Sequence, residues 1–393
     1  MRIAFLSRHF DPQGGGAERY SVAVAEELAQ RHEVHVFAQT FGSAPPQGWE
    51  PHKIPGPLRR PRWINQLWFA LATAWLTRRG FDVVYSHEHS WHGNVQCFHV
   101  LPIRHSLFKN RHGWRKALRI LKILTSPRLL AYWWLEGARL KGVTRGTRAV
   151  LAVSEPLRRT LEQTYPAVQG RVSVISPGVI ANAPKSFQDQ NSARLALGLP
   201  LDARLALLVA NDPLRKGLKT LIHALGLLPP EWKLVIAGNI PPLSAYRALA
   251  QDVGVLERLL FIGPQHDLRW AYHAADVLAH PTLEDTYGMV VLEAMANGLP
   301  VVVSGLPYCG ISAELSHGAQ AMVLPDPTDA QALAKALQML VDQPELSHHL
   351  AAQGHAWAGQ KTWSQCARAH EAVFEQVTAN SRGRPLAAQR PSS

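Results

Sequence analysis

The sequence predicts an α/β protein with two doubly wound parallel sheets, on three observations. Short apolar runs typical of buried strands alternate with amphipathic helical segments through residues 2–38 and again through residues 205–304. Glycine-rich turns follow several of these strands, as they do where a strand passes into a helix that binds a ligand. A chain of 393 residues is long enough for about two or three domains, each with its own hydrophobic core.

The composition describes a folded protein with an excess of positive charge. Hydrophobic residues make up 47% and charged residues 18%, and three widely spaced cysteines exclude a disulfide framework or a cysteine zinc site. The N-terminal residues read as a strand rather than a signal peptide, and no apolar run is long enough to span a membrane. We therefore expect a reducing, cytoplasmic location. The net charge of +12 favours an anionic partner: nucleic acid, acidic lipid or a phosphorylated ligand.

The first α/β unit has a glycine-rich turn. Residues 2–7 form an apolar run, residues 14–19 (GGGAER) follow, and a helix and a strand over 33–38 come next. The turn fits a dinucleotide-binding fingerprint poorly, because Arg19 stands where the third glycine would be. It is either a flexible connection or a backbone surface that a ligand approaches closely.

Histidines gather after the next strands. Residues 42–62 are proline-rich and predicted irregular, 63–79 form a helix, and 81–86 and 93–100 form strands. The irregular spacing of the histidines in this region argues against a metal site. His87 and His99 stand at the carboxyl ends of strands and are the better candidates for site chemistry, although a histidine bonded only to backbone is also common there. The five histidines are His87, His89, His92, His99 and His105.

Residues 104–148, the basic segment, carry twelve basic residues against the single acid Glu136. Tryptophans and leucines lie between these charges, which is typical of a helix at a membrane surface. Nucleic-acid binding competes, but no binding motif accompanies the charges, and an ordinary helix pair with a solvated basic face is a further alternative. We favour an anionic membrane surface. The basic residues are Arg104, Lys109, Arg111, Arg115, Lys116, Arg119, Lys122, Arg128, Arg139, Lys141, Arg145 and Arg148.

A second α/β series follows a predicted linker over 176–192. Before the linker, strands are predicted at 149–154 and 172–175, with a helix from 155. After it, strands are predicted at 205–210, 233–237, 259–262 and 276–279, with helices over 218–228 and over 266–275. The pattern predicts a first domain over 1–176 and a second over 177–360. Residues 361–380 are predicted as a C-terminal helix that can return to the first domain, and 381–393 as a disordered tail.

The stretch from His280 to Ser304 contains the sequence features that point most clearly to a ligand-binding site. A strand, an acidic loop, a helix and a strand follow one another, and the loop lies at the carboxyl end of its strand, where open α/β sheets bind ligands. The amides at the start of the helix, from Tyr287 through Gly288 and Met289 to Val290, carry a partial positive charge suited to phosphate.

These motifs resemble the family-four retaining glycosyltransferases of the GT-B class. The resemblance rests on EDTYGMVVLEAMANGLPVV, RKGLKTLIHAL, KLVIAGN, VISPGV, AVLAVSE and the glycine-rich first turn, and it covers nearly the whole chain. Bacterial lipopolysaccharide core and other cell-envelope transferases are the most similar members. The resemblance implies two Rossmann-like domains that face each other across a cleft, the first on the acceptor side and the second binding the nucleotide sugar.

The resemblance also assigns roles to residues. The family has two glutamates separated by seven residues; here Glu293 fits the second, which contacts ribose, and Asp285 replaces the first, which contacts the donor sugar. A helix-start residue that touches no ligand is the alternative for Asp285. Arg215 and Lys216 match the pair that binds the diphosphate. His99 matches a first-domain histidine near the sugar, so Asp285 and His99 are the catalytic candidates.

Further residues are assigned to substrate binding. They are Gly15 and Gly16 in the first domain, and Tyr287, Gly288, Met289 and Val290 in the second. Neither a metal nor a cofactor is expected beyond the donor, because fixed cations and helix amides neutralise the leaving diphosphate and no Asp-x-Asp pair is present.

The expected function is a metal-independent retaining transferase that moves a hexose from a UDP-sugar to a lipopolysaccharide or other envelope acceptor. It is expected at the cytoplasmic face of the inner membrane, without nucleic acid; the sequence indicates no oligomeric state. Two alternatives remain at this point. One is a nucleotide-sugar epimerase of the same architecture, and the other is a non-catalytic nucleotide-sugar-binding module.

Overall fold

The computed structural model describes residues 1–42, 48–58, 60–109, 113–181, 183, 186–239 and 244–381. The chain divides into two compact domains. The first comprises Met1–Gly178 together with the segment from Trp363, and the second comprises Val179–Thr362. The boundary lies two residues beyond the predicted position, and the final helix belongs to the first domain. Each domain is described below by itself.

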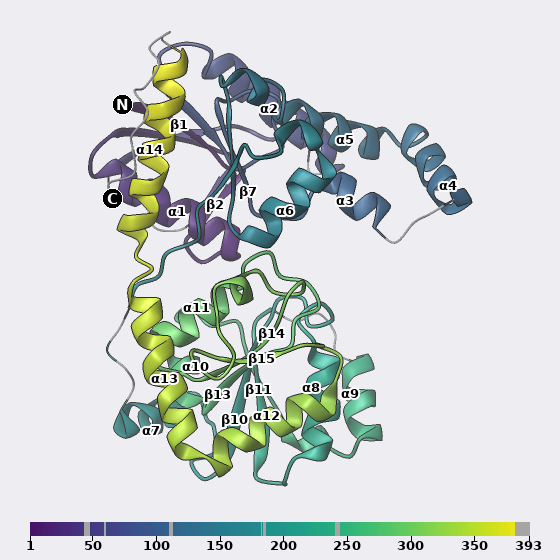
Figure 1. The fold of residues 1–393 in the computed structure, drawn as a ribbon, viewed down its shortest axis with the longest axis vertical. Coiled ribbons are helices and arrows are strands. Elements are labelled where there is room, and N and C mark those ends of the chain that lie inside the picture. Colours follow the sequence, from purple (N-terminus) through teal and green to yellow (C-terminus); the bar gives the residue numbers. More distant parts are fainter. Residues whose placement is uncertain are drawn as a thin grey trace. The chain divides into compact units, whose positions relative to one another are not determined.

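The first domain is built on a seven-stranded, entirely parallel sheet (Figure 1). The strand order is β5-β3-β1-β6-β7-β8-β9, so the chain winds outward from β1 in both directions. The strands are β1 (Arg2–Leu6), β3 (Glu33–Ala38), β5 (Trp49–Lys53), β6 (Val83–Ser86), β7 (Val95–Phe98), β8 (Ala149–Ala152) and β9 (Val172–Val174). A separate two-stranded ribbon pairs β2 (His9–Phe10) with β4 (Thr40–Phe41).

Helices lie around this sheet, except α4 (Gly113–Leu124), which extends away from it (Figure 1), and the last helix of the chain is one of them. They are α1 (Gly16–Ala29), α2 (Arg62–Leu76), α3 (Ile103–Phe108), α4 (Gly113–Leu124), α5 (Pro127–Arg139), α6 (Glu155–Thr164) and α14 (Trp363–Ser381). His370 of α14 is buried, and its Nε2 lies 3.1 Å from the Tyr20 hydroxyl of α1 and 2.8 Å from the Tyr85 hydroxyl of β6. These buried polar contacts fix α14 to the first domain.

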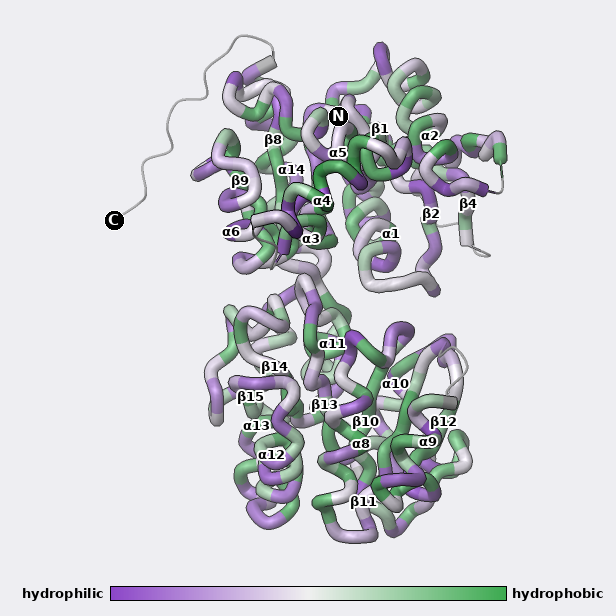
Figure 2. The backbone as a smooth tube through the Cα atoms, turned by 90° about the vertical axis from the view of Figure 1, so that its right-hand side faces the viewer, coloured by the Kyte–Doolittle hydropathy of each residue, from purple (hydrophilic) through white to green (hydrophobic). Residues whose placement is uncertain are grey.

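The second domain has a six-stranded parallel sheet with the order β12-β11-β10-β13-β14-β15. Its strands are β10 (Arg204–Val209), β11 (Trp232–Ala237), β12 (Leu259–Gly263), β13 (Val277–His280), β14 (Val301–Ser304) and β15 (Met322–Leu324). Its helices are α7 (Phe187–Ala196), α8 (Leu218–Leu227), α9 (Ser244–Asp252), α10 (Arg269–Ala274), α11 (Met289–Ala296), α12 (Ala330–Asp342) and α13 (Pro344–Gly359). In Figure 2 outer helices such as α12 carry both hydrophilic and hydrophobic stretches, as half-buried helices do.

The predicted fold class, two doubly wound Rossmann-like sheets, is confirmed. Two local predictions are wrong. Residues 42–62 contain β5, an edge strand whose Pro51 weakens the strand signal but is tolerated at a sheet edge. The predicted linker contains α7, which starts at a capping box between Ser186 and Asp189. Most of the predicted disordered tail, from residue 382 on, lies outside the described residues.

No helix among the described residues is both long enough and apolar enough to cross a membrane.

Candidate functional site

Two loops of the second domain meet at the carboxyl edge of its sheet. Because β10 and β13 are neighbours, the loops that follow them are adjacent. The Leu283 amide donates to the Arg215 carbonyl at 2.8 Å, and the Thr282 hydroxyl donates to the same oxygen at 3.1 Å. Gly217 has a φ of +81°, and a Cβ there would lie 2.0 Å from the Pro281 carbonyl oxygen. Only glycine allows this close approach.

These loops and the end of β13 bring together three charged or polar side chains, one of which, Lys216, is 69 residues away from Asp285 in sequence. Asp285 Oδ2 accepts a hydrogen bond from the Lys216 ammonium and lies 3.2 Å from His280 Nε2. Only 17% of the Asp285 side chain and 18% of the Lys216 side chain is exposed. Burial alone would raise the pKa of Asp285, but the bond to His280 and the charge of Lys216 outweigh it and hold that pKa well below its usual range. The carboxylate is therefore ionised and fixed.

Arg215, beside this buried pair, is held much more loosely. Its guanidinium lies 3.6 Å from Asp212 and 3.7 Å from Glu284, and 53% of its side chain is exposed. Both distances exceed those of well-formed hydrogen bonds. The guanidinium can therefore turn toward an incoming anion at little energetic cost.

Helix α11 begins next to this cluster and presents its first amides. Gly288, its N-cap, has a φ of +103°, and a Cβ there would lie 2.8 Å from Cys309 Sγ. The carbonyl of buried Tyr287 accepts from the Ile311 amide at 2.6 Å, which fixes the turn. The amides of Met289 and Val290 belong to the first turn, where a helix offers no partners of its own. Together they provide an anion-binding helix terminus.

Glu293 lies one turn further along α11, with its side chain partly exposed. Its Oε2 accepts a hydrogen bond of 2.8 Å from the hydroxyl of Tyr272, a buried residue of α10. Since this bond holds one carboxylate oxygen in place, the side chain is oriented before a ligand arrives.

In the first domain, the glycine-rich turn ends at the start of α1. The Gly15 amide donates to Glu18 Oε2 at 2.8 Å. A Cβ on Gly14 would collide with Glu18, whereas a Cβ on Gly15 would meet nothing within 4 Å. Gly14 is thus required by local packing. The space beside Gly15, which is followed by Gly16 at the first position of α1, is open to a ligand.

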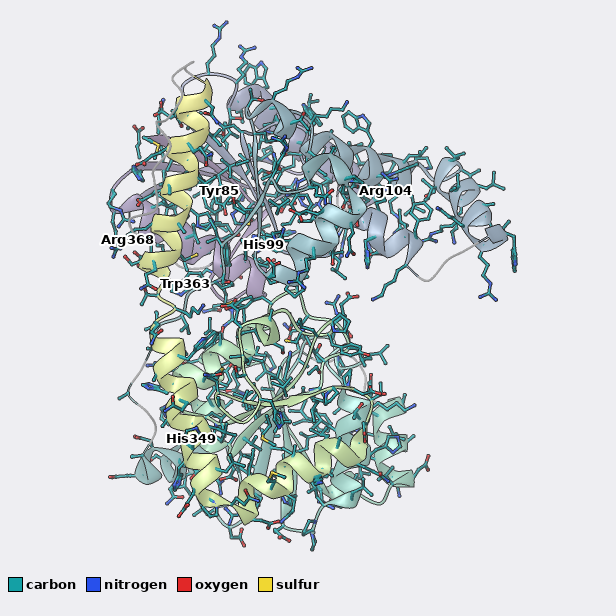
Figure 3. All side chains as sticks on the ribbon, viewed as in Figure 1. Tyr85, His99, Arg104, His349, Trp363 and Arg368 are labelled. Atoms are coloured by element: carbon teal, nitrogen blue, oxygen red, sulfur yellow. The ribbon has the colours of Figure 1, made fainter. Side chains whose placement is uncertain are left out.

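His99 is partly exposed just beyond the carboxyl end of β7 (Figure 3). Its ring stacks on that of His87. His99 Nε2 and His87 Nδ1 are 2.6 Å apart, and the Ser21 oxygen is 3.0 Å from the same His87 atom. Ser21 donates its proton to the Ala17 carbonyl, so its oxygen accepts from His87. The proton then lies on His87 Nδ1, and the Nε2 of His99 is an acceptor.

This arrangement fixes the protonation of His99. Burial, followed by the charge of Arg139, lowers the pKa of His99 to about 3. Burial and neighbouring His99 likewise place the pKa of His87 well below its ordinary value. Both rings are neutral near pH 7, and His99 carries its single proton on Nδ1. His99 is therefore a neutral hydrogen-bond donor at the sheet edge.

Comparisons with known proteins agree with this geometry. The family described as Glycosyltransferase Family 4 matches residues 14–182, and the family described as Glycosyl transferases group 1 matches residues 189–357. One match falls in each domain. The chain belongs to the GT-B glycosyltransferases.

Individual relatives span nearly the whole enzyme. It is 28% identical to D-inositol 3-phosphate glycosyltransferase of Corynebacterium efficiens, over 96% of each chain. It is 25% identical to the lipopolysaccharide glucosyltransferase WaaG of Escherichia coli, over 88% of this chain and 91% of that protein.

Solved structures share the fold. A crystal structure of WaaG superposes with a TM-score of 0.80 at 21% identity, over 95% of this chain and 99% of that one. HepE of Anabaena, solved in complex with UDP and glucose, gives 0.74 at 19% identity, over 95% and 99%.

The basic side chains of the basic segment differ in their exposure to solvent in this glycosyltransferase. Arg139 is buried rather than exposed; its guanidinium lies 3.9 Å from the centre of the Phe98 ring and donates to Gln96 and to the Cys97 carbonyl. Arg148 donates to the last carbonyls of α5, including that of Ala138. These two cations hold the fold together. Exposed basic residues remain, among them Arg115, Lys116 and Lys122 on α4.

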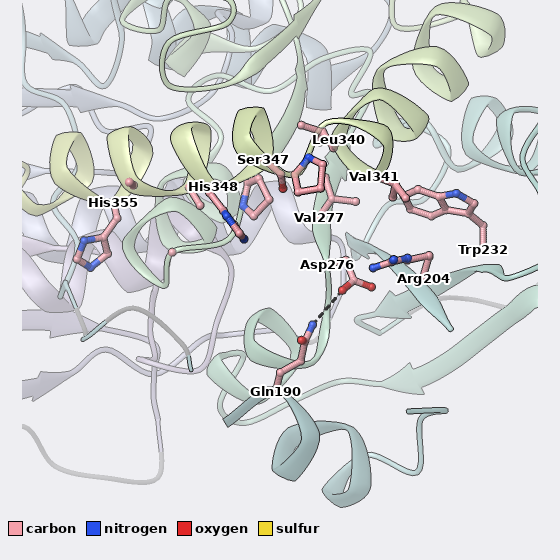
Figure 4. Close-up of a pocket in the computed structure, with 15 residues that line it drawn as sticks. Gln190, Arg204, Trp232, Asp276, Val277, Leu340, Val341, Ser347, His348 and His355 are labelled. Atoms are coloured by element: carbon pink, nitrogen blue, oxygen red, sulfur yellow. Dashed lines mark hydrogen bonds between the residues drawn. The ribbon is translucent and has the colours of Figure 1, made fainter. Parts of the chain in front are cut away.

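A pocket of about 470 Å³ lies at the other edge of the second sheet (Figure 4). It is lined by the starts of β10 and β11, at Arg204 and Trp232, and by one side of α13. Asp276 in this pocket is already bonded to Gln190 and Arg194. None of the predicted donor-site residues lines it. The charged loops at the carboxyl edge form the candidate site.

The structure brings several predicted residues together in the second domain. Arg215, Lys216 and Asp285 meet at one edge of the second sheet, with the start of α11 beside them. Two supporting residues, His280 and Tyr272, were not predicted as site residues from the sequence. His280 ends a strand directly before the acidic loop, which is the signal that selected His99. Tyr272 had no signal in the sequence, because it reaches Glu293 only through the packing of α10 on α11.

Proposed function

We propose that the enzyme transfers a hexose from a UDP-sugar, with retention of configuration, to a lipopolysaccharide or other envelope glycan or lipid. The single observation that supports this most is the cluster at the carboxyl edge of the second sheet. There Lys216, Arg215 and the first amides of α11 converge where open α/β sheets bind nucleotides.

This cluster suits a leaving diphosphate. As the bond between the sugar C1 and the diphosphate oxygen breaks, negative charge grows on the leaving group. A fixed ammonium, a mobile guanidinium and a helix N-terminus stabilise that charge without a metal ion. Glu293, oriented by Tyr272, accepts hydrogen bonds from the ribose hydroxyls.

The transfer step conserves the proton of the acceptor. The acceptor oxygen forms a bond to C1 on the face from which the diphosphate departs, and its proton passes to the departing diphosphate oxygen. His99, neutral and with a donor at Nδ1, positions a sugar hydroxyl rather than attacking C1. Asp285, fixed by Lys216 and His280, faces the sugar and keeps the ammonium in place.

The donor and acceptor classes are proposed from similar proteins. HepE was solved with UDP and with UDP-glucose, which supports a uridine donor. WaaG is named as a lipopolysaccharide glucosyltransferase, which supports an envelope acceptor. The other relatives act on inositol phosphate, so a phosphorylated acceptor is a second candidate.

A transfer assay tests the proposal. Labelled UDP-glucose, UDP-galactose, GDP-mannose and ADP-glucose are each incubated with the enzyme and a bacterial envelope extract, and in parallel with inositol 3-phosphate. We expect label in the lipid-extractable or lipopolysaccharide fraction with one UDP-sugar. Transfer from GDP- or ADP-sugars alone would contradict the uridine donor, and transfer to inositol phosphate alone would contradict the envelope acceptor.

We also propose that the enzyme binds the cytoplasmic face of the inner membrane through α4. Trp114, Leu118 and Leu121 follow one another at helical spacing, and 69%, 55% and 58% of them is exposed. Arg115 and Lys122 lie on the adjacent face. Figure 1 shows α4 extending away from the first sheet, so this apolar face is uncovered within its domain. An apolar face edged with cations is the composition of an interfacial membrane helix.

Replacing Trp114 and Leu118 together with serine should weaken binding to vesicles that contain phosphatidylglycerol by about 100-fold, since each buried side chain contributes about 1.5 kcal/mol or more. Sedimentation with vesicles measures the binding. Replacing the equally exposed Leu195 and Leu227 of the second domain is the matched control. Wild-type binding should fall at high salt. Equal binding by both double variants would contradict a role for α4.

A further inference from the structure

Three side chains cluster on one face of the first sheet, on β3 and the edge strand β5. His35 of β3 and Glu50 of the edge strand β5 are direct partners in the parallel ladder. His52 lies two residues beyond Glu50, so all three side chains project from the same face of the sheet. This group was not predicted from the sequence, because β5 was not predicted.

The distances within this group suit a tetrahedral metal ion. His35 Nδ1 lies 2.9 Å from His52 Nε2 and 3.2 Å from the Glu50 carboxylate, and His52 Nε2 lies 3.6 Å from that carboxylate. Zinc bonds of about 2.0–2.2 Å at tetrahedral angles place neighbouring ligand atoms about 3.3–3.6 Å apart. A small opening of the His35–His52 contact brings all three atoms to bonding distance of one ion.

Both ring nitrogens of His35 have close polar neighbours. Its Nε2 lies 2.8 Å from the Glu33 carboxylate and 3.2 Å from Arg2 Nε. Its Nδ1 faces the Glu50 carboxylate and the Nε2 of His52. A cation held by these three groups would take Nδ1 of His35 as a ligand. A histidine that donates its second N–H to a carboxylate is the usual outer arrangement of a zinc ligand.

Packing fixes the rings of His35 and His52, while the exposed carboxylate of Glu50 keeps the group accessible to ions from solvent. His35 is buried against Phe81, and the His52 ring stacks on Phe37 at 4.5 Å between centroids. The Glu50 side chain is 62% exposed, which gives an ion a route from solvent and a free position for water.

We propose that His35, Glu50 and His52 form a binding site for Zn²⁺ or a similar divalent transition metal, with water as the fourth ligand. The ion joins the edge strand β5 to β3 and takes no part in glycosyl transfer. The proposal is independent of the proposed function, because it concerns β3 and the edge strand β5 of the first sheet and none of the residues assigned to transfer.

Titration of the metal-free full-length enzyme with Co²⁺ tests this site. We expect one equivalent to give the intense visible absorption of tetrahedral Co²⁺, and Zn²⁺ to displace it. His52→Ala and Glu50→Gln should weaken Zn²⁺ binding by about 100-fold, and Glu33→Gln by about 10-fold. His9→Ala, an exposed histidine of the same domain, should have no effect.

Three outcomes would overturn the proposal. One is binding that persists unchanged in His52→Ala and Glu50→Gln. Another is a thiolate-to-cobalt absorption band, which would place the ion at the separate group of His87, Cys97 and His99. Absence of stoichiometric Co²⁺ and Zn²⁺ binding to the folded wild-type enzyme, checked by circular dichroism, would also overturn it. His52 and Glu50 are partly exposed, so their variants should keep the fold.

Discussion

Replacing Lys216 with alanine is expected to reduce kcat for sugar transfer by about 10²–10³-fold. The substitution removes a fixed cation from the position where the leaving diphosphate gains charge, and loss of one such group typically has an effect of this size. It also leaves Asp285 without the ion pair that fixes its carboxylate. Steady-state transfer from the UDP-sugar measures the change. Lys219→Ala, at an exposed position of α8, is the matched control and should retain wild-type activity.

The same variant should be less stable, in a pH-dependent manner. The folded-state pKa of Asp285 lies below its unfolded value of about 3.9, so its ion pair stabilises the fold above that pH and loses the effect as pH falls further. Removing Lys216 from this largely buried pair should cost about 2–4 kcal/mol at pH 7. Urea denaturation should show the gap between the two proteins narrowing below about pH 4. A gap independent of pH would contradict the assigned pairing.

Glu293→Gln is expected to reduce kcat/KM for the donor by about 10²-fold. Two hydrogen bonds from ribose hydroxyls to a carboxylate are weakened, and bonds to a charged group contribute about 1.5–3 kcal/mol each. Initial rates at subsaturating UDP-sugar measure the change. Tyr272→Phe removes only the bond that orients Glu293 and should lower the same ratio by about 10-fold or less. Glu345→Gln, exposed on α13, is the control. Unchanged kinetics in Glu293→Gln would place ribose elsewhere.

The succession of strands and helices was largely predictable, because buried parallel strands appear as short apolar runs. The exceptions have local causes. Pro51 interrupts the pattern of β5, and the polar sequence of α7 shows little apolar periodicity. Neither exception affects the carboxyl edge of the second sheet. For this reason the residues of the candidate site were identified even though the element list was incomplete.

The pairing of Lys216 with Asp285 was not predictable from the sequence. It depends on β10 and β13 being neighbours, whereas two other strands separate them along the chain. The buried position of Arg139 was equally hidden, since a count of charges treats every cation as solvated. The Arg139 guanidinium contacts Phe98 and Gln96 instead of solvent, and these contacts form only in the packed domain.

Calorimetric titration of UDP into the wild-type enzyme and three variants tests the central assignment most directly. The assignment predicts binding by the wild type, at least about 30-fold weaker binding by Lys216→Ala and Glu293→Gln, and unchanged binding by Arg204→Ala, at the pocket on the opposite edge of the same sheet. Wild-type affinity in Lys216→Ala and Glu293→Gln, with binding lost in Arg204→Ala, would contradict it.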